Sequence, residues 1–229
     1  GSGKTTLMNM ISGIYFPDEG EIIVNGQEAC IRSPFDAFQL GIGMIHQHFK
    51  LVDVFTAEQN IIMGLPGKNR LDMKAISAEI QTLIEKYGFE MDTRKKIYEM
   101  SVSEKQTVEI MKVLYRGAKI LILDEPTAVL TPQETEKLFS VLRRMKADGK
   151  AIIIITHKLH EVLDISDRVA VLRKGEYIGC IDTKDADELS LTEMMVGKKV
   201  ELDIERPKPK NVKTRIKVEH LTCTDQYGV

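Results

Sequence analysis

Two uninterrupted apolar runs stand out in the middle of the chain. The first covers residues 120–123 and ends in Asp124 and Glu125, and the second covers residues 151–155 and is followed by His157. Apolar runs without polar alternation are typical of strands buried on both faces of a parallel sheet. The sequence therefore predicts two parallel strands with polar side chains at their carboxyl ends.

The helix expected between these runs is marked at both ends. Thr131 suits the N-cap, Pro132 the first helical position, and Glu134 the closing residue of a capping box. Apolar side chains follow at helical spacing, and Gly149 suits the stop. Strand, helix and strand in this order predict a βαβ unit.

Other segments carry weaker periodicity. Apolar residues recur at helical spacing over residues 72–87, and Gly88 follows as a stop, so we interpret residues 56–117 as a mainly helical insertion in an α/β core. Residues 169–172 predict a strand that ends in a turn, and residues 188–196 predict a short helix.

The composition of the chain changes near residue 198. Residues 198–215 are charged and contain prolines, which is typical of an exposed linker, and residues 216–221 alternate like a new strand. The predicted organisation is one domain over residues 1–197, a linker over 198–215, and the start of a second domain over 216–229.

Composition and charge narrow the class of protein. Hydrophobic residues make up 43% and charged residues 29% of 229 residues, as in ordinary globular proteins. The net charge of -2 argues against a nucleic-acid-binding surface, which needs clustered Lys and Arg. Three scattered cysteines indicate reduced thiols in a cytoplasmic protein. No run approaches the roughly 20 apolar residues of a membrane span, so we expect membrane contact through a partner.

The first residues carry a phosphate-binding pattern. They match the end of G-x-x-x-x-G-K-[ST], a loop whose backbone N–H groups approach an anion at a helix N-terminus. Lys4 is expected to reach the β- and γ-phosphates, and Thr5 to bind Mg²⁺. The first glycine of the pattern falls before residue 1, so we expect the strand that feeds the loop upstream. The expected nucleotide-binding residues are Gly1, Ser2, Gly3, Lys4, Thr5 and Thr6.

The acidic end of the first apolar run fits the same chemistry. Asp124 is suited to a metal ion, and Glu125 to a base that polarises an attacking water. Taken alone, two acids after a buried strand are an ordinary surface feature. Together with the phosphate loop, they indicate nucleotide hydrolysis.

The order of four motifs resembles that of the ATP-binding-cassette (ABC) family. After the phosphate loop come residues 43–47, similar to the family's Q-loop, then residues 123–127 around its Walker B strand, and then residues 155–157 with the switch histidine. The resemblance implies an α/β P-loop NTPase of the ABC type, with a mainly parallel core sheet and a helical subdomain insertion, truncated at its N-terminus.

The resemblance also implies roles for single residues. Gln47 would contact Mg²⁺ or the attacking water, and His157 would hydrogen-bond the γ-phosphate. The expected catalytic residues are then Glu125, His157 and Gln47, and the expected Mg²⁺ ligands are Thr5, Gln47 and Asp124.

The family's signature loop is matched less closely. Residues 100–106 stand in its place, with Ser103 where the family usually has a glycine. Ser101 aligns with it, and the resemblance implies that Ser101 faces ATP held by a second cassette, in trans. Thr131 stands where many members carry Asp, at the segment that connects paired sites.

Within the family, short stretches such as residues 41–52 and 108–118 resemble those of bacterial sugar and nucleoside importers whose ATPase carries two cassettes on one chain. That implies a peripheral protein on the cytoplasmic face of the membrane that uses ATP and Mg²⁺. Its implied partners are a second ABC domain, transmembrane permease subunits and, indirectly, an extracytoplasmic solute-binding protein, with no nucleic acid. Two alternatives stay open: a soluble ABC-type ATPase of translation or DNA repair, and a truncated non-catalytic fragment.

Overall fold

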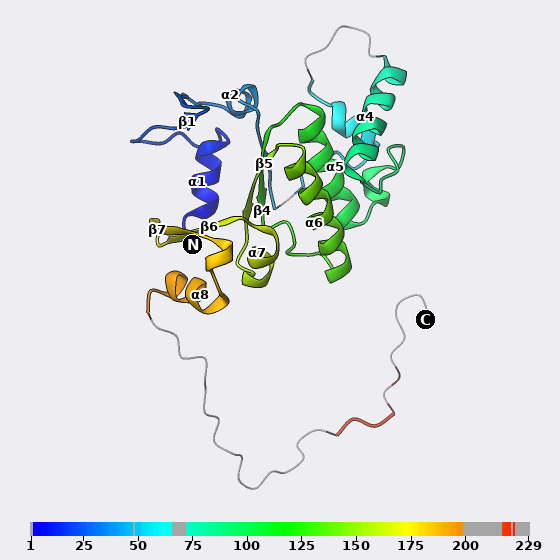
Figure 1. Ribbon diagram of the computed structural model, residues 1–229. Coiled ribbons are helices and arrows are strands. Elements are labelled where there is room, and N and C mark those ends of the chain that lie inside the picture. The colour runs from blue at the N-terminus through cyan, green and yellow to red at the C-terminus, as the bar shows by residue number, and fades with distance from the viewer. Residues whose placement is uncertain (1, 48, 66–71, 199–216, 221, 223–229) are drawn as a thin grey trace. The chain divides into compact units, whose positions relative to one another are not determined.

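The structure is a computed structural model that describes residues 2–47, 49–65, 72–198, 217–220 and 222 (Figure 1). The chain divides into two units, Gly1–Lys198 and Lys199–Val229. The elements of the first unit are, in chain order, α1 (Lys4–Ile11), β1 (Ile23–Val24), β2 (Gln27–Glu28), α2 (Pro34–Gln39), β3 (Ile42–Ile45), α3 (Ala57–Ile62), α4 (Met73–Tyr87), a 3-10 turn (Ile97–Glu99), α5 (Val102–Tyr115), β4 (Ile120–Asp124), α6 (Pro132–Ala147), β5 (Ala151–Ile155), α7 (Leu159–Ile165), β6 (Arg168–Arg173), β7 (Glu176–Asp182), a second 3-10 turn (Thr183–Asp185) and α8 (Glu188–Val196).

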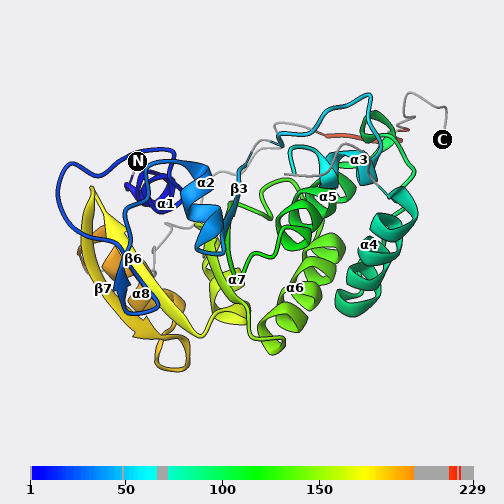
Figure 2. The same ribbon diagram turned by 90° about the horizontal axis from the view of Figure 1, so that it is seen from above.

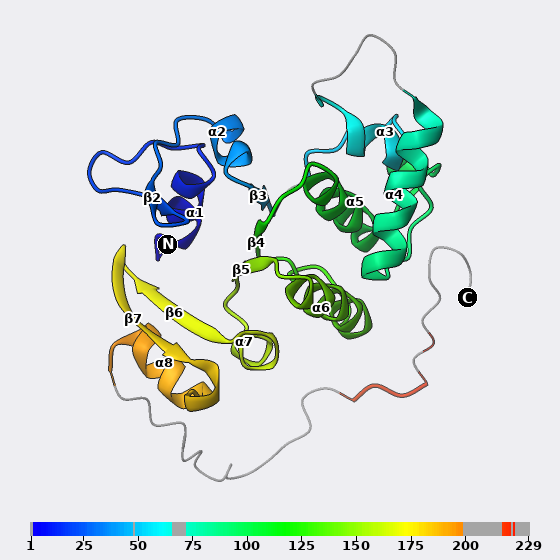
Figure 3. The ribbon, with the colours of Figure 1, turned by 45° about the horizontal axis from the view of Figure 1, so that its top comes forward.

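A three-stranded parallel sheet in the order β3-β4-β5 forms the centre of this unit. Its middle strand, β4, buries Leu121, Ile122 and Leu123 completely, as expected for a strand covered on both faces. Figure 3 shows α1 and α2 on one side of the sheet and α5 and α6 on the other. The two predicted parallel strands are confirmed, and β3 adds a third that the sequence analysis did not predict.

The predicted helix termini are also confirmed. Thr131 caps α6 by accepting a hydrogen bond from the Glu134 N–H, and the Glu134 side chain closes the capping box. Asp72 caps α4, and Gly88 ends it with φ 70°, a left-handed conformation that glycine adopts without strain. The predicted helix over residues 188–196 is α8.

The segment between β3 and β4 is mainly helical, as predicted. It contains α3, α4 and α5, and α4 lies beside α5 and α6 (Figure 2). Ile61 of α3, Ile80 of α4 and Met111 of α5 are fully buried, and they belong to the same apolar cluster as Leu123 of the sheet. The helical segment therefore shares a core with the sheet.

Two antiparallel hairpins accompany the central sheet. The predicted strand at residues 169–172 is β6, and it pairs with β7 across a turn at Lys174 and Gly175. The hairpin of β1 and β2 turns at Asn25 and Gly26, whose φ values of 54° and 79° are those of a tight hairpin turn. Among the described residues no helix is both long and apolar enough to cross a membrane.

Little of the second unit is described. The predicted linker over residues 198–215 lies outside the described residues apart from its first residue. Residues 217–220 of the predicted strand have no strand conformation, and its two end residues fall outside the described part. The start of a second domain at residues 216–229 therefore stays a prediction.

Candidate active site

The predicted phosphate loop leads directly into α1. Gly3 is the N-cap of this helix and has φ 87°, a conformation that favours glycine. The Lys4 Nζ donates a hydrogen bond to Ser2 Oγ at 2.7 Å, and Thr5 and Thr6 are exposed in the first turn. The first N–H groups of a helix have no partner within it, so they suit an anion. Gly1 lies outside the described residues.

The turn between β6 and β7 contacts this loop. The Gly175 N–H donates to the Ser2 carbonyl at 3.2 Å, and a Cβ on Gly3 would lie 3.3 Å from the Gly175 Cα. The approach of the two backbones is thus a second reason for glycine at position 3. No local sequence signal predicts this contact, because Gly3 and Gly175 are 172 positions apart in the chain.

Asp124 and Glu125 lie at the carboxyl end of β4. Asp124 is 8% exposed. Glu125 has φ 49°, where a residue with a side chain is strained by roughly 1–3 kcal/mol, and its N–H donates to the Ile155 carbonyl at 2.8 Å. This hydrogen bond joins the ends of β4 and β5.

The Glu125 carboxylate faces His157. Its Oε1 lies 2.9 Å from the His157 Nδ1, although 32 positions separate the two residues. Its Oε2 is buried and has no hydrogen-bond partner among the described residues. A buried carboxylate oxygen without a partner is costly, so the site suits a polar group from a ligand, such as a water molecule.

Gln47 follows the end of β3 and lines a cavity of about 120 Å³ together with Asp124 and Glu125. His46 lines the same cavity. Burial lowers the pKa of His46 from its usual value, and the nearby Lys50 charge lowers it further, against opposing effects of Glu109 and Asp124. The imidazole beside Gln47 is therefore held towards its neutral form.

Two buried polar side chains anchor the loop after Gln47. Glu109 of α5 accepts a hydrogen bond from the Lys50 N–H at 2.8 Å. Asn60 of α3 accepts from the Val52 N–H at 2.8 Å and donates to the Val52 carbonyl at 3.1 Å. Because Glu109 and Asn60 lie on the helical segment, these hydrogen bonds connect that segment to the loop after Gln47. The sequence analysis did not identify Asn60 or Glu109.

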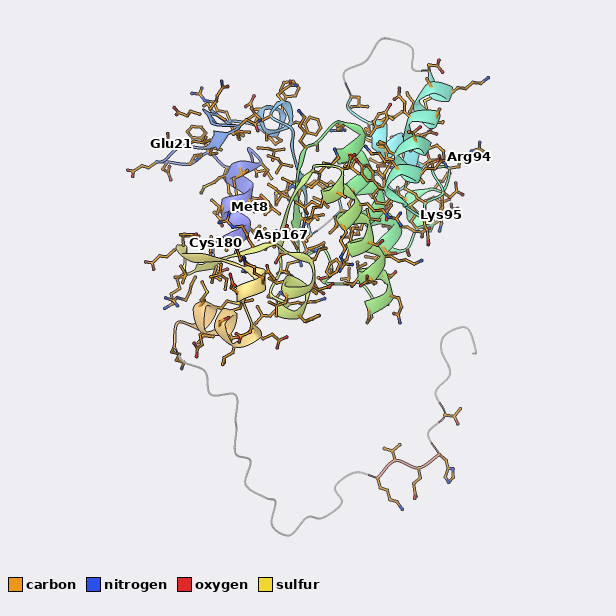
Figure 4. All side chains as sticks on the ribbon, in the orientation of Figure 1. Met8, Glu21, Arg94, Lys95, Asp167 and Cys180 are labelled. Atoms are coloured by element: carbon orange, nitrogen blue, oxygen red, sulfur yellow. The ribbon has the colours of Figure 1, made fainter. Side chains whose placement is uncertain are left out.

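Ser101 stands at the N-terminus of α5. Its hydroxyl accepts a hydrogen bond from the Glu104 N–H, and its own N–H donates to Glu104 Oε2 at 2.7 Å. Lys95, labelled in Figure 4, donates to Glu104 at 2.8 Å. Burial raises the pKa of Glu104, but the hydrogen bonds from Lys95 and Ser101 outweigh it and lower the pKa overall.

The structure thus brings part of the predicted site together. Asp124, Glu125 and His157 meet at the carboxyl ends of β4 and β5, with Gln47 beside the first two. Lys4 and its neighbours contact the turn between β6 and β7 instead, and no hydrogen bond or ion pair within the described residues connects Lys4 with Glu125. Ser101 has no hydrogen bond to either group among the described residues, and its role in trans stays a prediction.

The residues present fit a magnesium nucleotide. Mg²⁺ prefers oxygen ligands and is commonly held by one or two carboxylates together with substrate phosphates. At the cavity Asp124 offers a carboxylate and Gln47 an amide oxygen. Thr5, in the first turn of α1, offers a hydroxyl, and no hydrogen bond among the described residues connects it with these two. Among the described residues no group of three or more His, Cys, Asp or Glu is placed to hold a metal ion alone. The unpaired Oε2 of Glu125 adds a polar atom that a ligand-bound water would satisfy.

The sequence pattern of the family described as "ABC transporter" matches residues 1–128, more than half of the chain. This chain belongs to the ABC transporter family. The matched region ends just after the Walker B strand, β4, so it contains Lys4, Gln47 and Glu125.

Two curated relatives align with this ABC transporter chain along nearly its whole length. The "Nucleoside import ATP-binding protein NupA" of Lactococcus lactis subsp. cremoris is 46% identical over 222 residues, which cover 95% of this chain and 44% of NupA. The "Glucose import ATP-binding protein TsgD13" of Haloferax volcanii is 38% identical over 100% of this chain and 47% of TsgD13. The chain spans about half the length of the curated relatives it matches.

Solved structures agree on the fold of this ABC transporter chain. The ADP conformation of MJ1267, an ATP-binding cassette of an ABC transporter, superimposes with a TM-score of 0.73 and 24% identity, over 86% of this chain and 84% of that one. The expected fold, an ABC-type α/β cassette with a parallel sheet, is thereby confirmed.

Proposed function

We propose that this chain is the ATP-hydrolysing cassette of an ABC importer. The observation that carries the proposal is the pairing of Glu125 with His157 at the carboxyl end of the parallel sheet. A partly buried carboxylate that contacts a histidine and keeps one oxygen free is suited to take a proton from water. The cavity that Glu125 shares with Gln47 and Asp124 provides room for that water.

Each residue then has a defined task. Lys4 and the N-terminus of α1 bind the phosphates, and Asp124, Thr5 and Gln47 are the proposed Mg²⁺ ligands. The bound ion would neutralise phosphate charge as the phosphoryl group is transferred. Glu125 orients the water and accepts its proton, and His157 holds the Glu125 carboxylate in place or contacts the γ-phosphate.

The import function is proposed from the relatives. NupA is named for nucleoside import and TsgD13 for glucose import, and the identity to NupA is higher. We therefore propose a nucleoside as the transported solute, with a simple sugar as the second candidate. The protein would act at the cytoplasmic face of the membrane, with permease subunits and, indirectly, a solute-binding protein.

The domain organisation is part of the same proposal. We infer that residues 1–197 form a first cassette, preceded by its phosphate-loop strand, and that a second cassette begins near residue 216 on the same chain. The chain's coverage of somewhat less than half of its relatives supports a longer parent protein. Ser101 would then complete the nucleotide site of that second cassette.

ATP hydrolysis by the full-length protein, reconstituted with its permease in vesicles, tests this function. Glu125→Gln is expected to lower turnover by about 10²–10⁴-fold while ATP still binds, because the base is lost and the shape kept. Lys4→Ala should instead weaken ATP binding. Glu136→Gln, an exposed acid on α6 paired with Arg143, is the control and should hydrolyse ATP normally.

Two results would contradict the proposal. Undiminished turnover in Glu125→Gln would show that Glu125 is not the base. ATP hydrolysis at the same rate with and without the permease would contradict the importer function. Uptake of labelled nucleoside and labelled glucose by the same vesicles separates the two candidate solutes.

A further inference from the structure

A largely buried cluster of polar side chains, Thr127, Lys158 and Glu161, follows Glu125 and His157 closely in the chain. Thr127 is fully buried and donates a hydrogen bond from its Oγ1 to Glu161 Oε2 at 2.5 Å. Lys158 donates from its Nζ to the other Glu161 oxygen at 3.0 Å and to the Thr127 carbonyl at 2.8 Å. Glu161 itself, in the first turn of α7, is only 5% exposed. One carboxylate thus joins two separate segments of chain.

These two segments carry the reacting pair. Thr127 follows Glu125 by two residues, and the residue between them is Pro126, whose ring fixes its φ. Lys158 is the residue next to His157. Few residues therefore separate the cluster from Glu125 and from His157. Loss of the hydrogen bonds of Glu161 would change the position of Glu125 relative to His157.

The Pro126 backbone has a further anchor. Its carbonyl accepts a hydrogen bond from the buried Gln106 side chain of α5 at 2.8 Å. On the other side, the Glu125 N–H is bonded to the Ile155 carbonyl of β5. The segment that carries Glu125 is thus held at the Glu125 N–H and at the Pro126 carbonyl, and the hydrogen bonds of Thr127 provide the third anchor of the same segment.

Stability alone is a weak reason for such a cluster. Burying the Glu161 carboxylate and partly burying the Lys158 ammonium group costs about as much as their attraction returns, and well-packed apolar side chains often stabilise a fold equally well. What the charged cluster adds is a single fixed geometry, because both oxygens of Glu161 are assigned to named donors.

We propose that Glu161 is a positioning residue that sets the contact between Glu125 and His157. It acts on the reaction through Thr127 and Lys158 and touches no reacting atom. The inference rests on the proposed ATPase function and deepens it.

The experiment compares two substitutions in the full-length protein reconstituted with its permease. Glu161→Gln removes the charge that holds Lys158, and Thr127→Val removes the bridging hydroxyl without changing the side-chain shape. The matched control is Asp164→Asn, on the same helix, whose carboxylate pairs with Arg143 at the surface at 2.8 Å. Turnover, the ATP dissociation constant and the melting temperature are measured for each variant.

We expect turnover to fall at least about tenfold in both substitutions, with the ATP dissociation constant changed less than about twofold. A residue that only stabilises the fold would lower the melting temperature and leave turnover per folded molecule equal to that of Asp164→Asn, and this result would overturn the inference. If Glu161→Gln does not fold, Thr127→Val decides by the same comparison.

A second readout is specific to positioning. In a His157→Ala background the contact that Glu161 supports is already lost, so adding Glu161→Gln should change the residual turnover by less than about threefold. A further tenfold loss would overturn the inference. Unsubstituted protein without any ATPase activity would overturn the proposed function as well, whereas normal turnover that Glu161→Gln leaves unchanged would overturn the inference alone.

Discussion

Glu125 and His46 show how position in the fold adjusts single side chains. Glu125 is held in a left-handed backbone conformation, with one carboxylate oxygen on His157 and the other buried and free. His46, next to Gln47, is partly buried at the same cavity, and this burial lowers its pKa. The motif residues are recognisable from the sequence, but these environments come from the strands around them.

The lowered pKa of His46 predicts a pH dependence of stability. The unfolded chain takes up the His46 proton near the ordinary pKa of about 6.5, and the folded protein takes it up only at a lower pH. The contribution of neutral His46 to the free energy of unfolding is therefore fully present above the unfolded-state pKa. This contribution is lost as the pH falls through the folded-state pKa.

Thermal unfolding at pH 7.5 and 5.5 checks this expectation. The melting temperature of the unsubstituted protein should fall further on acidification than that of His46→Gln. His160→Gln, with a side chain that is 71% exposed, is the control and should behave like the unsubstituted protein. An equal fall in melting temperature in all three proteins would contradict the role given to His46.

At the scale of elements, the packing of β3 on α5 depends on one glycine. A Cβ on Gly43 would lie 2.1 Å from Cγ1 of Val113 and 3.3 Å from the Cβ of Ala118. Helix and strand therefore approach as closely as they do only because Gly43 has no side chain. The same glycine weakens the strand signal of residues 42–45, since glycine is unfavourable in strands.

Gly43→Ala is expected to destabilise the fold by about 1–3 kcal/mol, because the added methyl group overpacks the core. Val113→Ala creates space at the same point, so the double substitution should be more stable than the sum of the two single effects. Denaturant unfolding of the two single variants and the double variant measures this coupling. Strictly additive free energies of unfolding would show that the contact with Val113 does not cause the destabilisation by Gly43→Ala.

Several elements were readable from local signals and others were not. Apolar runs and capping residues predicted β4, β5, α4 and α6 with bounds close to those observed. The hairpin of β1 and β2 was missed, although its Asn25-Gly26 turn is a strong signal. Ser33 and Pro34 likewise marked the start of α2, which was also missed. Strands of two residues and a helix of six are too short to show periodicity.

At the scale of the first unit, we expect the helical segment and the sheet to unfold together. One apolar cluster runs from Ile61 in α3 and Ile80 in α4 to Leu123 in β4 and Leu142 in α6. A ligand-driven movement of the helical segment relative to the sheet would have to shift this shared packing. Asn60 and Glu109, which anchor the loop after Gln47, lie on the helical segment.

Ile80→Ala tests the shared core. Removing the fully buried side chain should cost about 2–5 kcal/mol, and hydrogen exchange should become faster in α6 and β4 as well as in α4. Ile23→Ala, at a side chain that is 60% exposed in β1, is the control and should change little. Faster exchange confined to α3, α4 and α5 would show that the helical segment opens independently.

The sequence by itself determined the chemical groups and their order along the chain. Lys4, Gln47, Asp124, Glu125 and His157 follow from motifs and from the polar ends of apolar runs. Only the tertiary structure decided that Glu125 contacts His157, and that Glu161 joins the segments behind them. Local periodicity encodes the direction a side chain takes from its own element. Contacts between residues 32 and 34 positions apart depend instead on the parallel register of β4 and β5, which forms only when the core packs.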